Sequence, residues 1–329
     1  MEPNSNMASN HGSVAAVEVI GLKRYFPNNV KAVDGVTFAI ANREVHGFIG
    51  PNGAGKTTTM RIMATIDHPD EGDILVNGVS LVNYPDEIRP SIGFMPDYLD
   101  SYKDMNVDEY LDFYARAYRL APAHRRRRLK DVIEFTGLGE FLDKPVDKLS
   151  KGMKQRLSLG RVLVNDPAVL VLDEPAAGLD PRARVELRTL IRMLADRGKA
   201  VFVSSHILTE LAEVCDSVTI IEKGKVRASG TVSEIEMKVS SGTKVEVCLP
   251  TADDSEKKRL AMALAEMPGV LSSAETHHGV VFTYDGDASV RAGILLKLVQ
   301  SGFCISDFHT ATSGLEDAFL RLTERKPDA

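Results

Sequence analysis

Short apolar runs alternate with longer segments of helical pattern along the chain as far as about Ser240. Three of these runs, Val45–Ile49, Val169–Leu172 and Ala200–Val203, have the mainly apolar character of strands that are covered on both faces of a parallel sheet. The helix-length segments between them provide the crossover connections that parallel strands require. We therefore predict an α/β domain, which we place at residues 14–240.

A different pattern interrupts this domain. No comparable apolar strand occurs between Asp97 and Asp166, whereas the run Val107–Leu120 has apolar residues at helical spacing. The segments after it have the same character, so we expect a helical subdomain at about 98–166, inserted into the α/β core. Residues 1–13 are polar and unpatterned, and we expect them to form a disordered tail.

Beyond Gly242 the order of elements changes, which predicts a second, smaller domain at residues 243–329. The expected order is strand, helix, strand, turn, strand, helix and strand, as in α+β domains of the ferredoxin-like type. The predicted elements are Lys244–Leu249, Ser255–Glu266, Val270–Glu275, Val280–Tyr284, Ala288–Gln300 and Phe303–Phe308, with a last helix at Gly314–Glu324.

Composition narrows the possible functions. Forty Lys and Arg residues stand against 46 Asp and Glu, a net charge of −6, so we expect no nucleic-acid partner. The three cysteines, Cys215, Cys248 and Cys304, lie far apart and predict a reducing compartment, core positions, and neither a disulfide nor a zinc site. No stretch reaches the roughly 18–20 apolar residues that cross a bilayer, so we expect a cytoplasmic protein.

A glycine-rich loop follows the predicted strand that ends at Ile49 and leads into a helical run. The loop fits the pattern G-x-x-x-x-G-K-S/T of phosphate-binding loops, whose backbone N–H groups and helix start face phosphate oxygens. We predict that Lys56 bridges the β- and γ-phosphates of ATP and that Thr57 places its hydroxyl on Mg²⁺. The residues of the loop are Gly50, Pro51, Asn52, Gly53, Ala54, Gly55, Lys56, Thr57 and Thr58.

Two carboxylates stand at the end of a second predicted strand. The run Val169–Leu172 ends in Asp173, Glu174 and Pro175, where a central strand meets the ligand edge of a sheet. Asp173 is predicted to hold the Mg²⁺ shell. Glu174 is predicted to orient and deprotonate the attacking water. The pattern therefore predicts hydrolysis of a nucleoside triphosphate.

A third motif makes the prediction specific. The segment Leu149-Ser150-Lys151-Gly152-Met153-Lys154-Gln155 precedes Asp173 and resembles the Leu-Ser-Gly-Gly-Gln signature of the ABC ATPase superfamily. The resemblance spans about Val17 to Gly230 and includes a segment like the D-loop, which ends at Asp180. It implies a P-loop NTPase (RecA-like) core with a helical insertion and an antiparallel β portion. The chain resembles ATP-binding subunits of export-type ABC transporters that carry a C-terminal accessory domain.

The resemblance also implies roles for individual residues. Ser150 and Gly152 would contact the γ-phosphate of ATP held by the opposite cassette, so that one chain supplies half of each site. His206, after the strand Ala200–Val203, would contact the γ-phosphate and the water. Asp180 would reach across the dimer, or serve only as the N-cap of the helix that Pro181 opens.

Two further positions are less regular. The ring of Tyr25 would stack on adenine, with two alternatives: Tyr25 only packs, or Phe26 stacks instead. Asp97 stands where the family usually has glutamine, and a carboxylate beside a γ-phosphate would be repelled. We therefore predict that Asp97 faces the metal ion or its water.

The function implied is that of an ATPase, with ATP and Mg²⁺, that drives a separate membrane permease by ATP-dependent dimerisation with a second cassette, expected as a homodimer. This would place the chain on the cytoplasmic face of a membrane. A second hypothesis is a soluble ABC ATPase that acts on a ribosome or a chromosome. A third, a GTPase or small-molecule kinase, lacks the N-K-x-D motif and leaves the signature unexplained.

Overall fold

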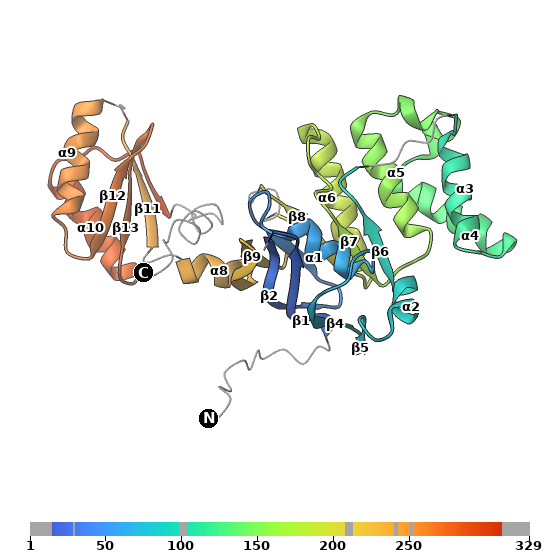
Figure 1. Ribbon diagram of the computed structural model, residues 1–329. Helices are drawn as coiled ribbons and strands as arrows, with labels where there is room; N and C mark the ends of the chain where they lie inside the picture. The colour runs from blue at the N-terminus through green and yellow to red at the C-terminus, as the bar shows by residue number, and fades with distance from the viewer. Residues whose placement is uncertain are drawn as a thin grey trace, which may run out of the picture. The chain divides into compact units, whose positions relative to one another are not determined.

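The apolar runs lie side by side in one sheet of the computed structural model (Figure 1). The strand order is β10-β9-β3-β8-β7-β6, with β10 antiparallel to β9 and every other pair parallel. All residues of β3 and β7 are buried, as expected for strands covered on both faces. The bounds are β3 Val45–Ile49, β6 Ile92–Met95, β7 Val169–Leu172, β8 Ala200–Ser205, β9 Ser217–Glu222 and β10 Lys225–Thr231.

The structure describes residues 15–28, 30–98, 104–207, 213–239, 243–250 and 253–310. It divides the chain into two compact units, Met1–Thr231 and Val232–Ala329. The division falls before the boundary predicted near residue 240, so that helix α8, Val232–Val239, groups with the second unit. The expected tail at residues 1–13 and the expected helix Gly314–Glu324 lie outside the described residues.

A smaller antiparallel sheet completes the first unit, with the strand order β2-β1-β4-β5. Its strands are β1 Ala15–Phe26, β2 Val30–Ala41, β4 Glu71–Val76 and β5 Val79–Ser80. Apolar residues of both sheets, among them Val19, Phe38 and Phe202, share one buried core with helix α1, Lys56–Met63. The core therefore fixes the loop before α1 against strands from both sheets.

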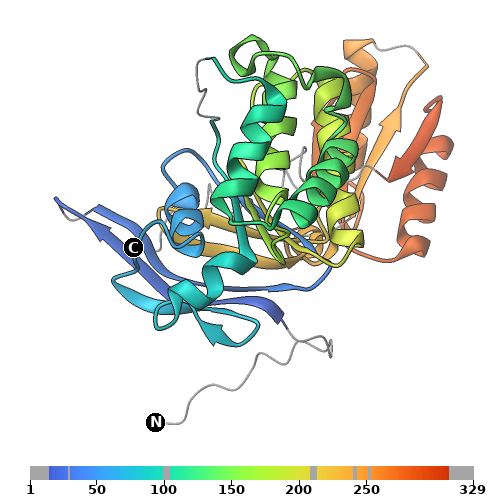
Figure 2. The ribbon, with the colours of Figure 1, turned by 90° about the vertical axis from the view of Figure 1, so that its right-hand side faces the viewer.

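Three helices form the expected insertion: α3 Val107–Ala117, α4 Pro122–Thr136 and α5 Lys151–Leu163. Figures 1 and 2 show them gathered at one end of the first unit, away from strands β1 and β2. They bury a core of their own that includes Tyr110 and Leu157. The remaining helical segments are α2 Pro85–Ile88, α6 Pro181–Asp196 and three short 3₁₀ turns, Arg89–Ser91, Gly139–Phe141 and Val146–Lys148.

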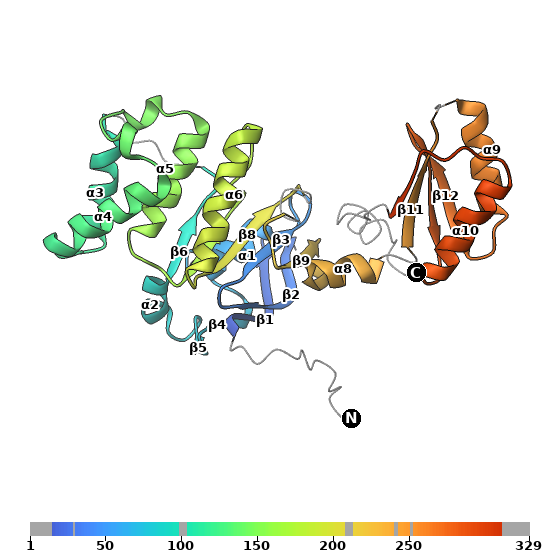
Figure 3. The ribbon, with the colours of Figure 1, turned by 180° about the vertical axis from the view of Figure 1, so that it is seen from behind.

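The second unit has the predicted order of elements. Its antiparallel sheet runs β12-β13-β11-β14, and α9 and α10 lie on the same side of that sheet (Figure 3). Leu260 and Leu298 from these helices pack on Val247 and Phe282 from the strands. The bounds are β11 Thr243–Cys248, α9 Asp254–Ala265, β12 Val270–Glu275, β13 Gly279–Tyr284, α10 Ala288–Gln300 and β14 Asp307–Thr310.

Two expectations need correction. The last strand begins at Asp307 and not at Phe303, because Phe303 packs into the core before the chain reaches the ladder beside β11. The cysteines do not all occupy the core: Cys304 is exposed, and Cys215 and Cys248 are partly buried. Within the described ranges, each helix is too short or too polar to cross a bilayer.

Candidate nucleotide-binding site

The glycine-rich loop joins β3 to α1 and passes between two strands. A Cβ atom on Gly50 would lie 2.3 Å from the carbonyl oxygen of Ile221, and one on Gly55 would lie 2.2 Å from that of Ala32. Gly55 also has φ of 107°, in the region that favours glycine. It is the N-cap of α1 without a side-chain hydrogen bond. The first N–H groups of α1 are therefore not capped by a side chain and face the site.

Lys56 begins α1 and turns its ammonium group back into the loop. The Nζ atom donates to the carbonyl oxygens of Gly50 at 2.8 Å and Pro51 at 3.3 Å, and it lies 3.5 Å from Oε1 of Glu174. The side chain is 6% exposed. A buried cation is thereby held at the loop by acceptors that phosphate oxygens could replace.

Asp173 lies at the carboxyl end of β7 and is 1% exposed. The hydroxyl of Ser204 on β8 donates to Oδ1 of Asp173 at 2.7 Å and accepts from the backbone N–H of Glu174 at 2.9 Å. Burial raises the pKa of Asp173 above its ordinary value, the carboxylates of Asp97 and Glu174 raise it further, and hydrogen bonds from Ser204 and Thr57 oppose this. Asp173, Asp97 and Glu174 therefore bring three carboxyl groups close together at this end of the sheet.

The carboxylate of Glu174 lies between the side chains of Lys56 and His206. One carboxylate oxygen lies near Lys56, and the other lies 2.8 Å from Nδ1 of His206, which follows β8. The backbone of Glu174 has φ of 46°, a left-handed conformation that costs about 1–3 kcal/mol for residues other than glycine. Strain of this kind is concentrated at functional sites.

Lys56, Glu174 and His206 line one cleft of about 540 Å³, whereas the buried Asp173 is not among its lining residues. Residues of the glycine-rich loop line it together with Asp97, Glu174 and His206. Lys151, which replaces the first signature glycine, also lines it and lies against Gly178. The lining consists of Ala32, Asn52, Gly53, Gly55, Lys56, Thr57, Thr58, Asp97, Lys151, Glu174, Ala177 and His206.

The structure places three other predicted residues at helix starts outside this lining. Ser150 is the N-cap of α5 and accepts from the N–H of Met153 at 3.4 Å, with Gly152 in the first turn. Asp180 is the N-cap of α6 and accepts from the N–H of Ala183 at 2.9 Å. Ser150, Gly152 and Asp180 are not among the residues that line the cleft of their own chain. Both helices thus have capped starts at the surface of the first unit.

Tyr25 also lies outside the cleft lining, near the end of β1. Its hydroxyl lies 3.5 Å from Oδ1 of Asp34, and the ammonium of Lys31 lies 5.7 Å from its ring centre. Phe26 is 39% exposed and carries the guanidinium of Arg24 over its ring. Neither ring is among the residues that line the cleft.

Sequence reasoning missed Ser204. It is fully buried and joins Asp173 to Glu174, yet a serine at a strand end carries no motif of its own. The available signal was its position two residues before His206, on the strand next to the acidic one.

Comparison with known proteins matches residues 33–177 to the family described as "ABC transporter". The "Nod factor export ATP-binding protein I" of Ralstonia nicotianae is 35% identical over 319 residues, covering 96% of each chain. The "Daunorubicin resistance ATP-binding protein DrrA3" of Streptomyces coeruleorubidus is 30% identical, covering 94% of this chain and 96% of its own. A solved "ATP binding subunit of ABC transporter" has a TM-score of 0.61 at 31% identity, covering 68% of this chain and 92% of its own.

Proposed function

Because the chain belongs to the ABC transporter family of ATP-binding proteins, we propose that it hydrolyses ATP to drive an export permease on a separate polypeptide. The likeness to relatives named for Nod factor export and daunorubicin resistance extends over both units, since it covers 94% or more of the chain. The names of these relatives differ in cargo, so they support export and assign no cargo here.

The convergence of Lys56, Glu174 and His206 at one cleft carries the proposal, and Asp173 lies buried beside Glu174, joined to it through Ser204. The loop N–H groups and the Lys56 ammonium bind the phosphates of ATP. A phosphate oxygen that replaces the carbonyl oxygens of Gly50 and Pro51 would become the charged partner of the Lys56 ammonium. Positioning and charge stabilisation of this kind account for most of the catalysis in phosphoryl transfer.

The residues at the end of β7 fit a magnesium ion. Asp173 and Asp97 supply carboxylate oxygens and Thr57 supplies a hydroxyl, the hard oxygen ligands that Mg²⁺ prefers. Burial raises the pKa of Asp173, and the neighbouring carboxylates of Asp97 and Glu174 add to this, two effects that a bound cation would oppose. When bound, the ion would neutralise charge on the phosphates. The hydrogen bond from Ser204 to Asp173 would keep the carboxylate in position for the ion.

Glu174 is the proposed base. It lies in hydrogen-bond reach of His206 and close to Lys56, so a water between Glu174 and the γ-phosphate would donate its proton to the carboxylate. His206 holds the carboxylate in one orientation. Removing a general base costs about 10²–10⁴ in rate, and we expect Glu174→Gln to lose turnover in this range while it still binds ATP.

The positions of Ser150 and Asp180 support a site that is completed by a second cassette. Both lie at helix starts and outside the cleft of their own chain, where a partner's γ-phosphate could meet the positive end of α5. Moving such a dimer from mostly open to mostly closed requires about 5.5 kcal/mol of differential ATP affinity. Phosphate contacts from both chains would supply this difference.

A mixing experiment tests the shared site. Lys56→Ala disables the phosphate loop and Ser150→Ala disables the signature, so each variant alone should be inactive. In a mixed dimer one site carries both defects and the other carries none. We expect an equal mixture of the two variants to regain up to a quarter of wild-type turnover, because about half of randomly formed dimers are mixed and each has one intact site of two. No recovery, together with a rate per chain that is independent of protein concentration, would disprove a shared site.

The permease is tested separately. Affinity capture of the full chain from detergent-extracted membranes of its source should recover a polytopic membrane protein, and Glu174→Gln should increase the yield by slowing release of the ATP-bound state. Capture of ribosomal or chromosomal components in its place would favour the soluble ABC ATPase. The chain would then keep its enzymatic assignment and lose its proposed place at the cytoplasmic face of a membrane.

A further inference from the structure

Strands β11 and β14 bring four side chains of the types that can bind metal ions to one face of the second unit's sheet. Cys248 pairs with Asp307 across the two strands, and Glu246 pairs with His309. Paired residues and residues two apart along a strand share a face, so all four lie together. The alternate residues Val245 and Val247 face the helix-covered core. The four polar side chains therefore occupy the opposite face, outside that core.

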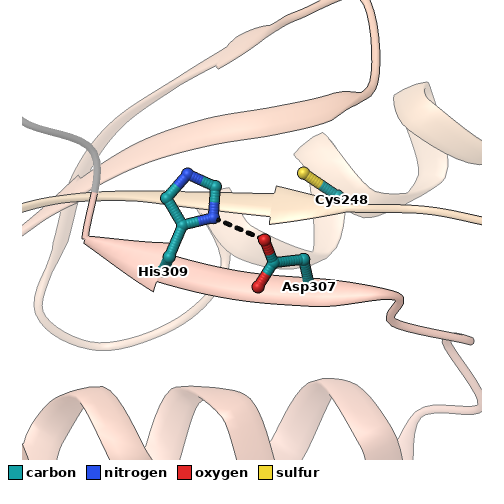
Figure 4. Close-up of side chains that lie close together, drawn as sticks. All are labelled: Cys248, Asp307 and His309. Carbon is teal, nitrogen blue, oxygen red and sulfur yellow. Dashed lines mark ion pairs between the residues drawn. The ribbon is translucent and has the colours of Figure 1, made fainter.

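Three of them offer donor atoms at metal-binding separation. The Sγ atom of Cys248, a carboxylate oxygen of Asp307 and a ring nitrogen of His309 all lie within 4.8 Å of one another. Figure 4 shows the three side chains grouped on adjacent strands, with His309 and Asp307 turned toward each other. Their Nδ1 and Oδ2 atoms are 3.0 Å apart. We propose that Cys248, Asp307 and His309 bind a divalent transition-metal ion, with zinc as the best fit.

The donor chemistry favours zinc over the magnesium of the nucleotide site. Zinc binds thiolate, imidazole and carboxylate together, at about 2.3 Å for sulfur and 2.0–2.2 Å for nitrogen and oxygen. Magnesium prefers oxygen ligands in an octahedron and does not select a thiolate. Ligand atoms around one zinc ion lie about 3–4 Å apart, so small side-chain rotations from the present positions would close the site.

Glu246 would orient the histidine. Its Oε2 atom lies 3.7 Å from Nε2 of His309, on the side of the ring away from Asp307. The hydroxyl of Thr276 donates to the other Glu246 oxygen at 3.0 Å and fixes the carboxylate. A carboxylate on one ring nitrogen selects the tautomer that leaves the other nitrogen free for a metal ion. A small rotation that closes the 3.7 Å separation to a hydrogen bond would let Nε2–H donate to Glu246 and leave Nδ1 for the ion.

The ion would link an edge strand to the sheet interior. In the sheet order, β14 lies at the edge and β11 lies inside it. The ion pair between Asp307 and His309 is roughly half exposed and adds little to stability by itself. A metal ion held by ligands from both strands would stabilise the second unit, with the fourth coordination position filled by water or by a partner group. This inference is independent of the proposed ATPase function.

Zinc binding by the full chain, without nucleotide or magnesium, tests the proposal. Isothermal titration with Zn²⁺ alone should give one tight site per chain, and Co²⁺ should give the sulfur-to-metal charge-transfer absorption of a thiolate ligand. Cys248→Ser and His309→Asn should each abolish that site, and Glu246→Gln should weaken it about 10- to 100-fold. Cys248→Ser should also remove the charge-transfer band.

The second unit supplies matched controls. Cys304→Ser and His277→Asn remove the same chemical groups from exposed positions outside the cluster, and both should keep the site at wild-type affinity. Zinc should raise the melting temperature of wild type and of both controls, and not that of His309→Asn. Zinc binding that survives Cys248→Ser and His309→Asn, or that the controls weaken equally, would overturn the proposal. If Cys248→Ser does not fold, the exposed Asp307→Asn replaces it as the decisive variant.

Discussion

Ser204 is the side chain whose removal most directly tests how the acidic strand end is supported. It is fully buried, donates to Asp173 at 2.7 Å and accepts from the backbone N–H of Glu174 at 2.9 Å. Ser204→Ala removes both bonds without changing the size of the side chain greatly. The carboxylate loses a donor, and the buried N–H of Glu174 is left without its acceptor.

The two hydrogen bonds of the Ser204 hydroxyl set the expected loss of unfolding free energy in Ser204→Ala. A hydrogen bond to a charged group contributes about 1.5–3 kcal/mol, and a buried unsatisfied donor costs about 1–3 kcal/mol. Both losses come from one hydroxyl, and local relaxation of the structure recovers part of each. We therefore expect Ser204→Ala to lower the free energy of unfolding by about 3 kcal/mol. For a unit of this size, about 2–4 °C of melting temperature corresponds to each kcal/mol, which gives a decrease of about 6–12 °C.

Ser205→Ala is the matched control. Ser205 is the next residue, is also buried, and accepts from the N–H of Ile207 at 2.9 Å with no carboxylate contact. Losing this one neutral bond should cost about 1 kcal/mol, or about 2–4 °C. The control should keep ATP turnover, whereas Ser204→Ala should lose at least about tenfold, because Glu174 can leave the orientation that its proposed role as base requires.

Differential scanning calorimetry of the full chain measures both effects, since it separates transitions when two units unfold independently. Steady-state ATPase rates at saturating Mg²⁺ and ATP complete the comparison. Equal melting temperatures and equal rates for Ser204→Ala and Ser205→Ala would refute the reasoning. A decrease in turnover for both variants would show that turnover depends on the end of β8 in general, and not on the link that Ser204 makes between Asp173 and Glu174.

Three further predictions concern the same cleft. Burial raises the pKa of Asp173 above its ordinary 3.8, so folding binds this proton more tightly and stability falls as the pH rises through the window above 3.8. Asp173→Asn should therefore melt higher than wild type at pH 7 without nucleotide, and this gain should shrink in melts at lower pH. Gly55→Ala should abolish ATP binding in a fluorescent-nucleotide assay, because its Cβ would meet the carbonyl of Ala32. Gly53→Ala has open space around it and only its φ of 79° against it, so it should weaken ATP binding by no more than about 1–2 kcal/mol. Asp97→Ala should raise the Mg²⁺ concentration that gives half-maximal turnover, and an unchanged value would contradict its metal-facing role.

Much of the fold could be predicted because its strongest signals are local. The strands β3, β7 and β12 and the helix α10 have the predicted bounds, since buried apolar runs and helical spacing depend on neighbouring residues. The phosphate loop and the acidic strand end were placed at one edge by the rule that parallel strands present their carboxyl ends together. Lys56 and Glu174 do lie 3.5 Å apart.

What could not be predicted depends on contacts between distant segments. The role of Ser204 requires knowing that β8 lies beside β7, which no property of the serine announces. The cluster of Cys248, Asp307 and His309 depends on the register between β11 and an edge strand whose start was placed too early. Cysteine spacing along the chain argued against a metal site, because it does not show which distant residues a sheet brings together.

The contacts of Lys56 suggest how nucleotide binding would change the surroundings of Glu174, the proposed base. Without nucleotide, its ammonium is shared between two loop carbonyls and Glu174, and Glu174 is also held by His206. Phosphate oxygens would draw the ammonium away from Glu174, because they carry more negative charge and lie where the loop N–H groups point. Glu174 would then be held by His206 alone, and the carboxylate oxygen that lies near Lys56 could accept a hydrogen bond from the attacking water. The same movement that binds ATP would therefore free the proposed base, Glu174, to orient the attacking water, and binding of ADP without a γ-phosphate would leave Lys56 closer to Glu174.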